Sequence, residues 1–166
     1  MGVKGLKIAA IIMSALLVVM LLMLTYLFLT AEVTVSVIGS RGIPASDQEE
    51  SFATLQKALE EDTFVGTLYQ KPMEWKTPSD YVYLQYTLSV HNGCLVPIDM
   101  IEVQIVPQPT DILQLGDTSC HSLNAKTDGT LTATLLAPKD SHPVREMIIS
   151  YYVWGVSFQL KTLAGK

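Results

Sequence analysis

The sequence predicts an all-β protein: an antiparallel sandwich with one short amphipathic helix, preceded by a single N-terminal transmembrane helix. Three observations support this fold class. An uncharged, strongly apolar run occupies positions 8–30. Beyond it, apolar and polar residues alternate in several short stretches, which is typical of half-buried strands. Turn-forming residues separate these stretches at a spacing that suits a sandwich of roughly six to eight strands.

The uncharged run is predicted to cross a membrane. As a helix that rises about 1.5 Å per residue, it reaches roughly 34 Å, which is enough for a bilayer core. Lys4 and Lys7 precede it, and Glu32 is the first charge after it. The positive-inside rule therefore places residues 1–7 in the cytoplasm and the rest of the chain outside. A cleaved signal peptide is the alternative, but its apolar region is usually only about 7 to 15 residues long.

Charge is distributed unevenly along the chain. All 16 acidic residues follow the apolar run, against 9 of the 11 basic residues, so the outer part has a net charge of −7. Such a domain lacks the basic stripe that phosphate backbones require, and we expect no nucleic-acid partner. The acidic surface is interpreted as a solvated face that aids solubility.

Behind the anchor, residues 31–45 are expected to form a membrane-proximal strand and loop. Val33 to Ile38 is rich in β-branched residues, and Gly39 to Pro44 is predicted to end the strand. Residues 46–62 are predicted to form the amphipathic helix, opened by a capping box at Ser46 to Glu49. Its apolar stripe, expected to face the core, consists of Phe52, Leu55 and Leu59.

The remainder, residues 63–166, is predicted to complete the sandwich within the same domain. Apolar and polar residues alternate most clearly from Val82 to Val90. The residues that follow, His91-Asn92-Gly93, are typical of a turn. A second alternating stretch, Ile101 to Ile105, is expected to pair with the first as a hairpin. Two later β segments are expected at 129–136 and 144–163.

The passage from Tyr83 to Val106 resembles membrane-anchored sandwich proteins of the late-embryogenesis-abundant group that carry the water-stress and hypersensitive-response domain. That family follows an alternating strand with an Asn-containing turn, a proline and isoleucine, and a second alternating strand. Asn92, Pro97 and Ile98 match this pattern, although His91-Asn92-Gly93 replaces the usual Asn-Pro-Asn turn. The resemblance implies an immunoglobulin-like or fibronectin-like sandwich and no particular activity.

The two cysteines, Cys94 and Cys120, leave three interpretations open. A disulfide outside the cytoplasm would close a loop of about 25 residues and stabilise the fold by about 3 kcal/mol. Two free thiols are the second possibility. The third is a tetrahedral zinc site that adds His91 and His121, although adjacent Cys-His residues rarely chelate one metal together. We expect no metal and no cofactor.

Three aromatics, Tyr83, Tyr152 and Trp154, are candidates for an exposed recognition patch. The sequence contains no G-x-S-x-G elbow, H-E-x-x-H motif or Walker loop, so no catalytic residue is assigned. We expect a non-enzymatic module of the cell envelope that contacts a partner protein. The alternative is a surface enzyme or glycan-binding module that uses His121 or an aromatic cleft, which requires a deep pocket with convergent polar groups.

Overall fold

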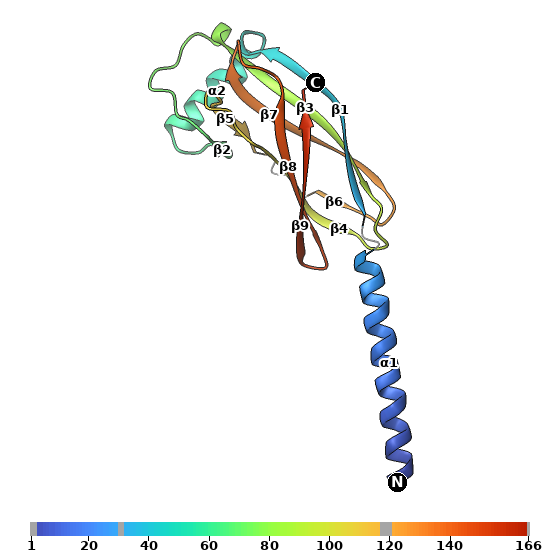
Figure 1. Ribbon diagram of the computed structural model, residues 1–166. Coiled ribbons are helices and arrows are strands. Elements are labelled where there is room, and N and C mark those ends of the chain that lie inside the picture. Colours follow the sequence, from blue (N-terminus) through green and yellow to red (C-terminus); the bar gives the residue numbers. More distant parts are fainter. Residues whose placement is uncertain (1–2, 30–31, 117–120, 166) are drawn as a thin grey trace.

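The computed structural model describes residues 3–29, 32–116 and 121–165. Helix α1 (Val3–Leu29) extends away from a β-sandwich that contains the rest of the described chain (Figure 1). The sandwich consists of two antiparallel sheets, one of five strands and one of four. The predicted combination of an N-terminal apolar helix and a mostly β sandwich is confirmed.

On one side the two sheets lie against each other, and on the other side the described residues leave a hollow between the sheet edges. The five-stranded sheet has the order β1-β3-β7-β5-β2, and the four-stranded sheet has the order β6-β4-β8-β9. Strand β1 lies along β9, whereas the short strands β2 and β6 end their sheets on the opposite side. The strands are β1 (Val33–Pro44), β2 (Gly66–Leu68), β3 (Tyr81–Asn92), β4 (Ile98–Ile105), β5 (Leu113–Leu115), β6 (His121–Leu123), β7 (Asp128–Pro138), β8 (Arg145–Val153) and β9 (Val156–Ala164).

Helix α1 contains the apolar run. Within it, Gly5–Leu27 is long and apolar enough to cross a membrane, and none of this segment is buried against the sandwich. A helix with these properties at the N-terminus either inserts into a membrane as an anchor or serves as a signal sequence.

The main core lies between the sheets and consists of the inward-facing residues of the long strands. Alternate residues of β3 and β7 pack against alternate residues of β4 and β8. Burial of this apolar surface is the dominant stabilising contribution. Its fully buried members include Leu88, Val90, Ile105, Leu135, Met147 and Ile149.

A second core covers the outer face of the five-stranded sheet at the end far from α1. Helix α2 (Glu49–Glu60) follows a short 3₁₀ turn, η1 (Ala45–Gln48), and buries Phe52, Leu55 and Leu59. These side chains pack with Tyr81, Tyr83, Ile112, Leu113 and Leu136. The predicted amphipathic helix is confirmed, but the predicted capping box is wrong because η1 leads into α2 without a side-chain cap hydrogen bond.

The expected end of the first strand at Gly39 is also wrong. Strand β1 continues to Pro44, with a register shift between Val37 and Gly39. An edge strand tolerates glycine, proline and a bulge because only one of its sides pairs with a neighbour.

The predicted hairpin between the two clearest strands is wrong, because β3 and β4 belong to different sheets. The buried side chain of Asn92 organises the crossover. Its Nδ2 donates hydrogen bonds to the carbonyls of Val96, Leu123 and Asn124, and its Oδ1 accepts one from the Cys94 amide at 3.0 Å. The turn residues therefore move the chain from one sheet to the other.

The two ends of the sandwich differ. At the end where β1 begins, which we call the proximal end, the Glu32 carbonyl accepts a hydrogen bond of 2.8 Å from the Gly93 amide. Only residues 30–32 separate α1 from β1. We call the opposite end, which carries α2, the distal end (Figure 1).

Candidate functional site

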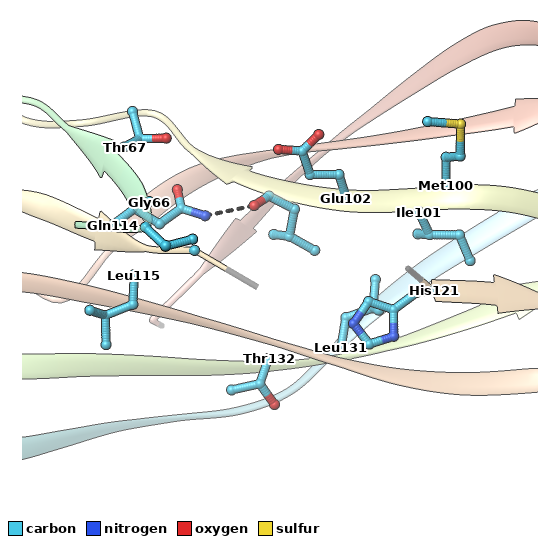
Figure 2. Close-up of a pocket in the computed structure, with 13 residues that line it drawn as sticks. Gly66, Thr67, Met100, Ile101, Glu102, Gln114, Leu115, His121, Leu131 and Thr132 are labelled. Carbon is cyan, nitrogen blue, oxygen red and sulfur yellow. Dashed lines mark hydrogen bonds between the residues drawn. The ribbon is translucent and has the colours of Figure 1, made fainter. Parts of the chain in front are cut away.

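A hollow of about 420 Å³ lies on the open side of the sandwich, between the two sheet edges (Figure 2). Strands β2 and β5 form one wall, and β4 and β6 form the other. Its polar lining residues are Thr67, Glu102, Gln114, His121 and Thr132. This is the place where the alternative interpretation, a surface enzyme, would have its active site.

The two titratable side chains of this hollow point away from each other. His121 pairs with the buried Ile101, and directly opposed residues of neighbouring strands share a face of the sheet. Glu102, one residue further along β4, is exposed on the other face. Figure 2 shows the carboxylate and the imidazole directed apart. Glu102 and His121 are therefore not placed to act together as a general acid and base.

The side chain of Gln114 closes the inner end of the hollow. Its amide forms hydrogen bonds with a backbone carbonyl and a backbone amide of β4, as the backbone of a paired strand would. Its Nε2 donates to the Val103 carbonyl at 2.7 Å (Figure 2). Its Oε1 accepts from the Ile105 amide at 2.7 Å. The Tyr69 hydroxyl is a hydrogen-bond donor to two nearby acceptors: the Ile105 carbonyl oxygen at 2.7 Å and Gln114 Oε1 at 2.9 Å. Burial, followed by the nearby charge of Asp111, raises the pKa of Tyr69 to about 12. Gln114 and Tyr69 therefore use their polar side-chain atoms in hydrogen bonds to each other and to the backbone of β4.

A buried ion pair lies nearby, at the distal end of the main core. Arg145 donates from Nε and Nη2 to the two oxygens of Asp111 at 2.8 and 2.7 Å, and the two side chains are 1% and 0% exposed. The Arg145 Nη1 also donates to the carbonyls of His142 and Val144. The Asp111 carboxylate additionally accepts from the Gln108 amide. This pair ties the segment before β5 to the start of β8.

The hydroxyl of Tyr86 belongs to the same region and donates to the Pro143 carbonyl at 2.5 Å. Burial raises the pKa of Tyr86 to about 12, with smaller and opposed effects from Arg145 and Asp111. Among the described residues, every buried side-chain nitrogen and oxygen has a hydrogen-bond partner. The sequence pattern predicts neither this network of Arg145, Asp111 and Tyr86 nor the hydrogen bonds of Gln114 to β4. Single polar residues inside apolar stretches form no recognisable motif.

The residues considered for zinc are not brought together in the described part of the chain. His91 is exposed and its Nδ1 lies 2.8 Å from an Asp128 oxygen, whereas Cys94 is a buried free thiol whose pKa is raised by burial. No three His, Cys, Asp or Glu side chains are grouped as metal ligands among the described residues. Cys120 lies outside the described residues, so its proposed disulfide with Cys94 stays a prediction.

The three candidate recognition aromatics separate into two groups. Tyr83 is only 4% exposed, so its assignment to an exposed patch is wrong. Its strand face would be solvated in a two-layer sandwich, but α2 covers it. Tyr152 and Trp154 are exposed at the proximal end, on and beside the turn between β8 and β9.

A second, shallower hollow of about 560 Å³ lies at the distal end, between α2 and the β2 edge of the five-stranded sheet. Strand β2 is exposed along its whole length, and Val65 and Leu68 present apolar side chains to solvent. The apolar lining of this groove consists of Leu55, Ala58, Phe64, Val65, Tyr83 and Leu115.

No protein-family model and no curated protein matches this sequence. Distant structural matches include a FixG-related protein from Vibrio parahaemolyticus, with a TM-score of 0.35 and 10% identity over 82% of this chain and 96% of that one. They also include a candidate lipoprotein, YcdA, from Bacillus subtilis, with a TM-score of 0.34 and 16% identity over 61% of this chain and 34% of that one. These matches assign no family, and the resemblance to the late-embryogenesis-abundant group stays a prediction.

Proposed function

We propose that this chain is a single-pass membrane protein whose sandwich lies outside the cytoplasm and binds a partner protein of the cell envelope without catalysing a reaction. The apolar helix supports the anchor, and Lys4 and Lys7 ahead of it support the orientation. In this proposal residues 1–7 are cytoplasmic, 8–30 span the membrane, and 31–166 form one outer domain.

The observation that carries the proposal is the edge strand β2, which the described residues leave exposed beside an apolar groove. An edge strand presents unpaired backbone amides and carbonyls, which natural proteins usually shorten, charge or cover. Here the strand is short but fully exposed, and the groove next to it is lined with apolar side chains. Such a surface suits an extended peptide segment that adds a strand to the sheet and inserts apolar side chains into the groove.

The charge around the groove indicates which segment would fit. Six acidic residues lie on or beside α2, namely Asp47, Glu49, Glu50, Glu60, Glu61 and Asp62, and all are exposed. Lys57 is the one basic residue among them. We therefore infer that the partner supplies an extended apolar segment flanked by lysine or arginine, because such charges complement this rim.

The strand order supports the finer, immunoglobulin-like assignment of the fold. Strands β1-β3-β7-β5 take the positions A-B-E-D of such a sandwich, and β4-β8-β9 take the positions C-F-G. Strand β6, which lies beside β4, takes the position next to C that is called C′. The order along the chain differs from the immunoglobulin scheme because β5, in position D, precedes β6. In addition, α2 and β2 are inserted between the first two long strands, β1 and β3.

The absence of catalysis is supported by the two polar regions of the core. In the hollow of Figure 2, Glu102 and His121 face opposite ways. The buried polar side chains of the described residues are all engaged in hydrogen bonds. A preorganised active site instead needs polar groups that converge on an empty position.

Site-specific photocrosslinking tests the proposed surface in intact cells that make the full chain. A photoreactive phenylalanine analogue is placed at Thr67 on β2 or, as the matched control, at Gln159, an exposed position on β9, the edge strand that lies along β1. The expected result is one defined crosslinked protein from position 67 and none of that protein from position 159. The crosslinked peptide is expected to be apolar with basic flanks.

Leu68→Asp supplies the second arm, because a carboxylate on the exposed β2 edge would repel an apolar segment paired with that edge. This variant is expected to lose the crosslink while the fold, followed by circular dichroism, is retained. An identical set of products from positions 67 and 159, or a crosslink that survives Leu68→Asp, would contradict the proposal.

A further inference from the structure

The proximal end of the sandwich exposes a group of large apolar side chains. Their exposed fractions are 56% for Leu95, 60% for Met100, 36% for Tyr152, 50% for Trp154 and 47% for Val156. They come from three places in the chain: the β3–β4 connection, the start of β4, and the β8–β9 hairpin. Three separate segments therefore place apolar side chains at the same end.

This end lies where the chain leaves α1. Four residue steps separate Leu29 from Val33, so the start of β1 lies within about 14 Å of the end of the helix. The Glu32–Gly93 hydrogen bond ties the β3–β4 connection to this entry point. Figure 1 shows the turn of the β8–β9 hairpin reaching to the level of the end of α1 that lies next to the sandwich.

Two of the apolar residues, Trp154 and Met100, have a positive φ, a backbone conformation in which Gly, Asn or Asp is favoured. Trp154 and Gly155 form a two-residue turn with φ values of 49° and 77°, closed by the pair Val153 and Val156. Asn, Asp or Gly is favoured at the first position of such a turn, and a bulky residue there is an outlier.

Met100 shows the same departure, with a φ of 51°. It lies where the register of β4 shifts against both of its neighbours, β6 and β8. Bulges of this kind turn a side chain in a new direction. Trp154 and Met100 are therefore large apolar side chains that the backbone holds, partly exposed, at positions where other residue types are favoured.

We propose that the proximal end rests in the interfacial layer of the same bilayer that holds α1, with Tyr152 and Trp154 at the level of the lipid headgroups. Trp and Tyr are the residues enriched at that depth, because each combines an apolar ring with a polar group. The short connection to α1 keeps this end at the membrane surface, so no diffusing partner is needed to cover it.

The neighbouring charges define the lipid chemistry. Glu32, Asp99 and Asp128 lie at the proximal end together with one basic side chain, Lys126, and with His91, whose Nδ1 lies 2.8 Å from an Asp128 oxygen. An end with this balance gains nothing from an anionic surface. The expected lipid is zwitterionic, and insertion of apolar side chains supplies the attraction.

The two tryptophans of the chain, Trp75 and Trp154, provide a direct test. Trp75 packs in the distal core against Phe52 and Tyr81, so it serves as an internal control. The full-length protein is reconstituted as Trp75→Phe, which retains Trp154, and as Trp154→Phe, which retains Trp75. Vesicles contain phosphatidylcholine that is either plain or brominated near the headgroup end of its acyl chains.

The emission of Trp154 is expected to fall about twofold in brominated vesicles, because an interfacial indole lies within reach of those bromines. The emission of Trp75 is expected to stay unchanged. If Trp75→Phe does not fold, the difference between the unsubstituted protein and Trp154→Phe yields the same quantity.

Equal emission of Trp154 in plain and brominated vesicles would overturn the proposal. This holds both if the indole faces water, where the soluble quencher acrylamide reaches it, and if a protein contact shields it from acrylamide. This test is independent of the partner-binding proposal, since it uses purified protein and does not involve the β2 edge. A failed crosslink at position 67 would leave the lipid contact intact, and the reverse also holds.

Discussion

Single polar side chains decide how the two sheets are held at the distal end of the core. The bidentate pair of Arg145 and Asp111 is fully buried, and Tyr86 and Tyr69 complete its surroundings. None of these residues belongs to a recognisable motif, and each lies inside or beside an apolar stretch. Sequence patterns report which positions face the core, but they do not report which buried polar groups will meet there.

Arg145→Met removes one half of the buried ion pair and leaves the Asp111 carboxylate without its counter-ion. We expect a loss of about 3–5 kcal/mol in the free energy of unfolding, because an unpaired buried charge is strongly destabilising. The double variant Asp111→Leu with Arg145→Met is expected to recover part of this loss. Urea denaturation of the full-length protein in detergent micelles measures both values, and a single variant as stable as the parent would disprove the argument.

Alkaline pH is expected to destabilise the domain through Tyr69 and Tyr86. Their pKa values are raised from 10.0 to about 12 in the folded protein. Both neutral phenols therefore favour folding below pH 10, and this contribution is lost as the pH rises through about 12. Absorbance of tyrosinate during a pH titration should show a late-ionising fraction, which loses one group in Tyr86→Phe. Ionisation of all tyrosines near pH 10 in the folded state would contradict this prediction.

At the level of elements, the long strands and α2 were predictable, while the arrangement of β2, β5 and β6 was not. Strand β3 buries alternate residues as its sequence pattern indicates, and 144–163 divides into β8 and β9 at Trp154 and Gly155. The three short strands span three residues each, which is too few for a periodic signal. Their positions depend on partners distant in the sequence.

Tyr83 illustrates the same limit at the candidate site. Its position on the outer face of β3 was correctly derived from alternation, but its burial depends on α2, which covers that face. The hairpin between β3 and β4 failed for a related reason. Two residues of the predicted turn, His91 and Asn92, belong to β3. The hydrogen bonds of the Asn92 side chain to Val96, Leu123 and Asn124 direct the chain into the second sheet.

Gln114→Leu is expected to loosen the attachment of β5 to β4. It leaves the buried Val103 carbonyl and Ile105 amide without partners, which costs about 1–3 kcal/mol for each group. Gln104→Leu is the matched control, since Gln104 is exposed on β4, the strand that Gln114 contacts, and its loss should change stability by about 0.5 kcal/mol or less. Thermal unfolding compares the two, and faster hydrogen exchange at Ile105 in Gln114→Leu alone would locate the effect.

For the whole molecule, the proposed orientation in the membrane depends on very few charges. Lys4→Glu with Lys7→Glu reverses the positive-inside bias, and we expect a fraction of the chains to insert with the sandwich in the cytoplasm. The control variant, Lys71→Glu with Lys76→Glu, makes the same charge change on the exposed surface of the outer domain. Protease accessibility of a C-terminal tag in intact cells measures the orientation. Unchanged orientation in the first variant, or loss of the N-terminal helix from the mature chain, would refute the assignment of a retained anchor.

The pairing of β1 with β3 also sets an order of events during synthesis. Val33, at the start of β1, pairs with Asn92, roughly sixty residues later, which corresponds to about 3–12 s at usual elongation rates of about 5–20 residues per second. During that interval the first strand has left the ribosome while its only hydrogen-bonded neighbour in the sheet does not yet exist. The waiting strand is β-branched and edge-forming, so these seconds are the period in which the nascent chain is most exposed to mispairing or to capture by a chaperone.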